Sequence, residues 1–480
     1  MPSHGRKTLE GTVLVLLGEA LVLPTGLVTL AFLTRWLGTT GYGLFTLAST
    51  LVVWIEWTIC SIFGRATNRC VAEVEDWRPA AATSLRLFVL AGALAAAALV
   101  LLARPVAGLL GEPALAGHLR VFALDIPLFC AAQAHRDILV GLGGYRQRAL
   151  LSAVRWLVRL ALLLVLVGLG LSVRGAIWAC IGTSAVELLV ARGLVAPPLF
   201  ARSAYRARRV LSYAAPLLVY AVCLRLFNRL DLVVLKALGA SAAEAGEYGM
   251  AQNLSLVPGI FTMTFAPLLQ STLVRMLREG QVDGARVMTR DALRAGLLLV
   301  PFAAIVAGGA AGIVRFVSGA EFAGAAAPLR LLILGAPGLV LVGIAAAILV
   351  AWDRTRWTVA IAAPLSPLAL AGLWAAVPRW GGAGAALVTA ACSWVGAAGG
   401  MAAALSAARA TLPVATIARV ALVSVAACAA AALSPDGPWL LPSLAAVAGG
   451  AVLALLALGE FDARERAAAW SVLTFRMRST

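Results

Sequence analysis

Residues 84–103 read SLRLFVLAGALAAAALVLLA, an apolar run in which Arg86 is the single charge. A helix of roughly 20 apolar residues crosses the hydrocarbon core of a bilayer. This run is therefore predicted to be a membrane-spanning helix. Similar runs precede and follow it along the whole chain, separated by short segments that carry charges, Gly or Pro. The sequence thus predicts an all-α, polytopic membrane protein.

The composition supports this prediction. Hydrophobic residues make up 62% of the 480 residues and charged residues 13%, and the mean hydropathy is +0.94. Soluble domains contain about 45–50% apolar and about 25% charged residues. A soluble fold could not bury this much apolar surface. We also expect the first apolar run, behind Arg6 and Lys7, to be a retained helix rather than a cleaved signal peptide, because no small-residue cleavage site follows it.

The runs indicate about 14 spans, with short loops that leave no room for a further folded domain. The predicted spans are 11–34, 42–63, 84–103, 118–140, 149–170, 175–197, 210–238, 246–270, 292–314, 326–350, 357–377, 383–406, 414–433 and 439–459.

The distribution of Lys and Arg predicts the orientation. If the N-terminus is cytoplasmic, 29 of the 39 basic residues fall on the cytoplasmic side and 8 on the other. Such a bias is typical of cytoplasmic loops. We therefore expect a multi-pass protein of the bacterial inner membrane with both termini in the cytoplasm. The formal net charge of +17 then needs no nucleic acid, because membrane lipids with anionic headgroups are sufficient partners.

A weak internal repeat divides the chain. Residues 36–43 (WLGTTGYG) close one span and open the next, and residues 238–239 (LG) followed by 246–249 (GEYG) do the same farther along. Duplicated halves with a site at their interface are a common plan of transporters. We predict a six-helix lobe over 1–197, a cytoplasmic linker over 198–209 and a second six-helix lobe over 210–406. Residues 407–480 would add two peripheral helices and a cytoplasmic tail.

Six short segments carry a family resemblance. Residues 32–38 (FLTRWLG) and 41–45 (GYGLF) resemble the opening of the oligosaccharide flippases of the multidrug/oligosaccharidyl-lipid/polysaccharide exporter superfamily. Residues 213–217 (YAAPL), 228–231 (NRLD), 238–239 (LG) and 246–249 (GEYG) resemble the helix 7–8 signature of the same proteins. The resemblance implies a two-lobed bundle that moves a lipid-linked, polyprenyl-pyrophosphate oligosaccharide from the inner to the outer leaflet by alternating access. Glycan polymerase and assembly proteins would be its partners.

Ionisable side chains within spans are costly, so they are candidate functional residues. Glu19 and Glu56 each lie about 8 residues from the cytoplasmic end of their predicted spans, roughly 12 Å deep at 1.5 Å per residue. They could share one cavity as a coupling site for H⁺ or Na⁺, or contact sugar hydroxyls. The alternative is that both carboxylates are hydrogen-bonded within the bundle. Asp125 and Glu187 are further buried candidates for ion coupling or for lining the cavity.

Arg225, Asn228 and Arg229 are spaced i, i+3 and i+4 and therefore share one helix face. Because guanidinium groups bind phosphate oxygens in a bidentate manner, this face could hold a pyrophosphate. The alternative is ion pairing with Glu19, Glu56 or Glu187. Asp231 points elsewhere and could pair with a neighbouring helix or with Lys236.

Several classes of enzyme are disfavoured because the sequence lacks their motifs. It contains no nucleotide-binding GxxxxGK[ST] loop, no HExxH or GxSxG motif and no metal-ligand spacing of cysteines. We therefore expect a non-enzyme with no catalytic residue, cofactor or metal. A cation-coupled multidrug exporter of the same superfamily and a peptidoglycan-precursor flippase are the alternative functions. A membrane glycan polymerase or ligase would need a larger outer loop.

Overall fold

The computed structural model describes residues 21–198, 205, 207, 210, 230–411 and 413–461. These residues form helices and no strands, as the sequence predicts. The first set of helices is α2 (Val22–Ala72), α3 (Trp77–Leu109), α4 (Pro113–Phe122), α5 (Asp125–Gly141), α6 (Tyr145–Leu166), the π-helix η1 (Val167–Leu171) and α7 (Ser172–Leu194). The second set is α9 (Ala242–Ser255), α10 (Gly259–Arg278), α11 (Val282–Leu297), α12 (Leu299–Gly308), α13 (Ala310–Ser318), the 3₁₀ helix η2 (Ala320–Ala325), α14 (Ala326–Ala351), α15 (Thr355–Ala408), α16 (Val414–Ala432) and α17 (Leu440–Ala457).

Ten of the described helical segments are long and apolar enough to cross a membrane by length and composition. Three of them are bent at a glycine with positive φ: Gly38 (65°), Gly170 (84°) and Gly381 (52°). Only glycine adopts such a φ without strain, so each glycine separates two arms. All three bends coincide with predicted boundaries between spans. The predicted total of about 14 spans stays a prediction.

The large apolar side chains on the outside of the helices fit a lipid environment. Leu101, Leu169 and Leu189 are each more than 70% exposed, although they lie in apolar helices. In water, such exposure over a large surface would favour association. In a bilayer, these side chains face hydrocarbon. The protein is therefore a multi-pass membrane protein.

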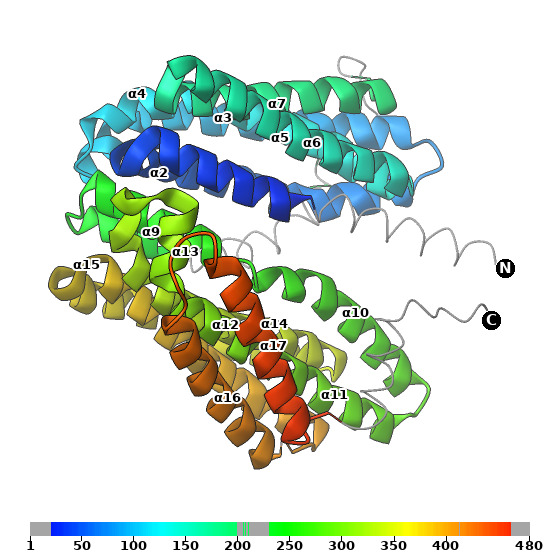
Figure 1. The fold of residues 1–480 in the computed structure, drawn as a ribbon. Coiled ribbons are helices and arrows are strands. Elements are labelled where there is room, and N and C mark those ends of the chain that lie inside the picture. Colours follow the sequence, from blue (N-terminus) through cyan, green and yellow to red (C-terminus); the bar gives the residue numbers. More distant parts are fainter. Residues whose placement is uncertain are drawn as a thin grey trace. The chain divides into compact units, whose positions relative to one another are not determined.

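The chain divides into two compact units. The first contains residues 1–250, 317–324 and 366–385, and the second contains residues 251–316, 325–365 and 386–480. Within the first, α2, α3, α5, α6 and α7 pack side by side (Figure 1). This division into two units follows the packing of the helices and not the sequence repeat. The two six-helix lobes predicted over 1–197 and 210–406 therefore stay a prediction. Most of the predicted linker lies outside the described residues.

In the second unit, α16 and α17 lie along α12 (Figure 1, orange and red). The contact between α12 and α16 is close, because a Cβ at Gly308 would lie 2.2 Å from the carbonyl oxygen of Cys428. A side chain at this position would overlap the facing backbone. The last two helices are therefore packed on this unit, and their predicted peripheral role stays a prediction.

Candidate functional site

Charged side chains gather inside the first unit, at positions where a membrane bundle would normally be apolar. Glu56 of α2, Asp125 of α5 and Glu187 of α7 are all buried, with exposed fractions of 2%, 4% and 0%. Burial of an ionised carboxylate costs several kcal/mol unless a partner compensates for it. Three of the predicted site residues are thus placed in the interior of one unit.

Glu187 is held by two arginines from neighbouring helices. Nη1 of Arg155 on α6 donates to Glu187 Oε2 at 2.6 Å, and Nη2 of Arg136 on α5 forms an ion pair with Glu187 Oε1. The guanidinium of Arg155 also lies 4.6 Å from the ring centroid of Phe129, within cation–π range. Glu187 therefore ties α5, α6 and α7 together.

The other two carboxylates form no direct ion pair with a described residue, although Arg155 and Arg159 lie near enough to interact with both and Ser184 contacts Asp125. Oε1 of Glu56 and Oδ1 of Asp125 are buried without a hydrogen bond from any described residue. Asp125 is the first residue of α5, directly after the break at Ala123 and Leu124 that separates α5 from α4. Unsatisfied buried oxygens of this kind are rare in native structures and require an explanation. A proton or a cation could satisfy them.

Asp231 is paired, but not with Lys236. The hydroxyl of Tyr248 donates to Asp231 Oδ2 at 2.6 Å, and the amide of Leu232 donates to its Oδ1 at 2.9 Å. Lys236 Nζ instead donates to Glu112 Oε1 at 2.9 Å. Of the two alternatives for Asp231, the structure thus shows a contact with a neighbouring helix, α9, and Lys236 contacts Glu112. The remaining predicted site residues, Glu19, Arg225, Asn228 and Arg229, lie outside the described residues.

Arg136 and Arg155 were missed as interior residues by sequence reasoning, which counted both among the cytoplasmic ends. A signal was present on α6. Arg148, Ser152, Arg155 and Arg159 are spaced i, i+4, i+7 and i+11, which places them on one helix face. A polar stripe of this length along a predicted span indicates a face turned toward other protein rather than toward lipid.

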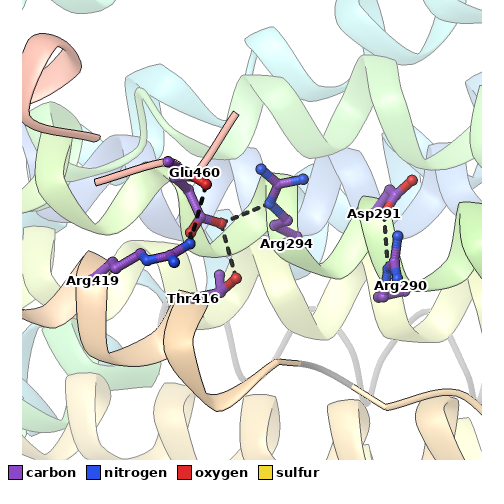
Figure 2. Close-up of polar contacts among 7 residues, drawn as sticks. Arg290, Asp291, Arg294, Thr416, Arg419 and Glu460 are labelled. Atoms are coloured by element: carbon purple, nitrogen blue, oxygen red, sulfur yellow. Dashed lines mark hydrogen bonds and ion pairs between the residues drawn. The ribbon is translucent and has the colours of Figure 1, made fainter. Parts of the chain in front are cut away.

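The second unit has a separate charged cluster (Figure 2). Glu460, in the turn that follows α17, accepts hydrogen bonds from Arg294 Nε at 2.7 Å, Thr416 Oγ1 at 2.9 Å and Arg419 Nη1 at 3.2 Å. Burial alone would raise the pKa of Glu460, but these hydrogen bonds and the charge of Arg294 outweigh it and lower the pKa. The cluster joins α11, α16 and the end of α17. Its polar groups satisfy one another, so we assign it a structural role.

No group of His, Cys, Asp and Glu among the described residues could hold a metal ion. A surface hollow of about 490 Å³ lies between α10 and α11. It is lined by Phe265, Leu269, Val287 and Met288, with Asp291 as the charged residue at its edge. Its apolar walls suit hydrocarbon better than a sugar.

Comparison with known proteins gives the family. Residues 8–274 match the model of the family described as polysaccharide biosynthesis protein. No curated protein sequence matches the chain. The fold resembles that of the lipid II flippase MurJ in an inward closed conformation, with a TM-score of 0.70, 14% identity, and coverage of 96% of this chain and 98% of that one.

Multidrug transporters share the fold as well. An inward-facing MATE family transporter of the MOP superfamily matches with a TM-score of 0.64 and 16% identity, covering 82% of this chain and 94% of its own. The Vibrio cholerae MATE transporter VcmN matches with a TM-score of 0.60 and 16% identity, covering 85% of this chain and 98% of its own. At these identities the structures show the fold alone. The family model matches more than half of the chain, and the chain therefore belongs to the polysaccharide biosynthesis protein family.

Proposed function

We propose that this protein moves a polyprenyl-pyrophosphate-linked oligosaccharide from the inner to the outer leaflet by alternating access, for assembly of cell-surface polysaccharide. The observation that carries the proposal is the match of residues 8–274 to the polysaccharide biosynthesis family. A fold shared with a lipid II flippase supports it, because that protein's named substrate is also carried on a lipid. The expected location is a bacterial inner membrane, with glycan polymerase and assembly proteins as partners.

The direct test is depletion of the protein in its own cells. We expect lipid-linked oligosaccharide to accumulate on the inner leaflet and surface polysaccharide to fall, with drug susceptibility unchanged. Accumulation of the peptidoglycan precursor instead would favour the second candidate, a peptidoglycan-precursor flippase, which the similarity to MurJ supports. Increased drug susceptibility with normal polysaccharide would favour the multidrug exporter.

Arg225 and Arg229, with Asn228 between them on the same face, are proposed to bind the pyrophosphate during the crossing. A hydrogen bond to a charged group contributes about 1.5–3 kcal/mol, which is weak enough for release. Arg→Lys keeps the charge but loses the bidentate geometry, so transport should fall in part. Ala at both positions should nearly abolish transport while the protein stays in the membrane. Normal surface glycan in cells that carry the double Ala variant would exclude this role.

Glu56 and Asp125 are proposed to bind the coupling ion, H⁺ or Na⁺, with Glu19 as a further candidate. The support is their burial and the two oxygens that no described donor satisfies. Gln at position 56 and Asn at position 125 preserve the shape of each side chain and remove its charge. The double variant should therefore fold normally but transport poorly. Its remaining transport should no longer depend on pH or sodium. The matched control is Glu73→Gln, directly after the end of α2, where the carboxylate is in an exposed pair with Arg69. Ion dependence that survives in the double variant would reduce both carboxylates to structural residues.

A further inference from the structure

The glycine-rich motifs of the two repeats contact each other directly. A Cβ at Gly43 would lie 1.8 Å from the carbonyl oxygen of Ala242, and one at Gly246 would lie 2.2 Å from that of Thr39. A Cβ at Gly249 would lie 2.5 Å from Cγ2 of Thr46. Such separations are possible only between a glycine and the chain that faces it. The second arm of α2 and the first turns of α9 therefore touch backbone to backbone.

A buried ion pair closes the same interface. Lys236 belongs to the second repeat, and its side chain is 5% exposed. Its Nζ donates to Oε1 of Glu112, the residue before α4 in the first repeat, and to the carbonyl oxygen of Ala240 at 2.7 Å. Arg35 of α2 donates in addition to the carbonyl oxygen of Val317 at 3.0 Å. Each of these bonds spans more than a hundred residues, except the local one to Ala240.

All of these contacts lie at turns on one side of the bundle. The bend at Gly38, the turn before α4, the turn at Gly239 and the segment 317–324 all connect helices at the face that the sequence predicts to be opposite the cytoplasm. The contact between α2 and α9 places glycines against facing backbone, and the adjacent Tyr42 and Tyr248 are buried. The pair between Lys236 and Glu112 can help to hold this close-packed contact shut.

We propose that the two contacting segments, residues 39–46 and 242–249, form an outer gate that the Lys236–Glu112 pair latches. The gate must open for a substrate to leave toward the outer leaflet. This inference rests on the proposed role as a transporter but not on the identity of the substrate. It assigns to the repeated glycines a role in closure and to Lys236 a role in setting how often the gate opens.

A reversible crosslink tests whether the contact has to open. The Cβ built at Gly249 lies 3.3 Å from Cβ of Thr46, close to the 3.5–4.5 Å separation in disulfides. In a background without the native cysteines, oxidation of the Thr46→Cys/Gly249→Cys variant should form the bond and stop surface glycan assembly. Reduction should restore it. The two single variants under the same oxidant control for damage by the reagent.

A second crosslink within one repeat is the matched control. A Cβ at Gly92 of α3 lies 3.2 Å from Cβ of Cys130 of α5. Gly92→Cys with Cys130 retained should also crosslink, but transport should continue. A crosslink between residues 46 and 249 that leaves transport intact would overturn the proposal, because the contact would then be permanent. Absence of that crosslink would overturn it too, because the motifs would not be in contact.

The latch is tested without any substrate. Thr46 is buried under the contact, so a membrane-impermeant maleimide should label Thr46→Cys slowly from outside. Adding Lys236→Met or Glu112→Gln should raise the labelling rate about tenfold to a hundredfold, the factor expected for loss of one hydrogen bond to a charged group. Asp436→Asn is the control, because Asp436 forms an exposed pair with Arg315. An unchanged rate in both latch variants would refute the latch. If the wild-type protein supports no glycan assembly, the labelling result still stands, so failure of the proposed function and failure of the gate are distinguishable.

Discussion

Replacement of Glu187 by Gln should destabilise the protein strongly. Glu187 is fully buried, and the side chains of Arg136 and Arg155 are 11% and 14% exposed. Water therefore cannot replace the lost carboxylate, and both guanidinium groups lose their ion pair with Glu187. Breaking a buried pair by removal of one partner costs about 3–5 kcal/mol. The Gln amide oxygen still accepts a hydrogen bond, so we expect a value near the lower end.

The measurement is equilibrium unfolding of purified protein in mixed micelles with increasing denaturing detergent. The matched control is Glu73→Gln, which removes the same charge from an exposed i, i+4 pair with Arg69. Pairs of this kind contribute about 0.3–0.5 kcal/mol, so the control midpoint should hardly move. The comparison separates loss of the buried network from loss of charge in general.

Replacement of the whole network provides the internal check. Leu at positions 136, 155 and 187 together removes both the carboxylate and the two guanidinium groups. Apolar replacement of a complete buried ion network is often neutral or stabilising, so the triple variant should recover most of the loss. If Glu187→Gln unfolds at the wild-type midpoint, the network does not support the fold and the reasoning above is refuted.

Three further predictions concern other contacts. Glu460 has a lowered pKa in the folded protein, so its charge stabilises the fold above about pH 4.5, and this contribution disappears as the pH falls through the folded-state pKa. The difference in unfolding temperature between the wild type and Glu460→Gln should therefore shrink from pH 7 to pH 4, and a constant difference would contradict this. Gly308→Ala should lose about 1–3 kcal/mol on the same unfolding assay because its Cβ meets the backbone of α16, whereas Gly450→Ala in α17, with open space around it, should lose nothing. Tyr248→Phe removes the hydrogen bond to buried Asp231 and should cost about 1–3 kcal/mol, and a neutral result would show that the bond is dispensable.

Hydropathy predicted most of the helices because lipid imposes one length and one composition on every span. It also placed the boundaries at Gly38, Gly170 and Gly381. It did not predict breaks inside spans. The predicted span 118–140 is interrupted at residues 123–124, and the span 246–270 is interrupted before Pro258, which precedes α10. Breaks of this kind depend on how a helix packs on its neighbours, which the average hydropathy of a segment does not record.

The candidate site was predictable in part. Burial of Glu56, Asp125 and Glu187 followed from their place in apolar runs, because an ionisable residue there must face protein or water. The side chains that pair with Glu187 could not be predicted in the same way. Arg136 and Arg155 lie near predicted span ends, where snorkelling to the headgroups is the usual interpretation, and only three-dimensional packing brings them to Glu187. Likewise, the repeat was visible in residues 36–43 and 246–249, but their mutual contact was not.

The ion network around Glu187 also has a consequence for biogenesis. During synthesis α5 and α6 reach the membrane before α7, so Arg136 and Arg155 arrive before the carboxylate that pairs with them. An arginine within a span costs free energy, less toward the span ends than at the centre, until a carboxylate or the headgroups satisfy it. The arginine-bearing helices should therefore become more stable in lipid once α7 has been added. Helices α5 to α7 are expected to leave the translocon together, and a chain truncated before Glu187 should be recognised and degraded as unassembled.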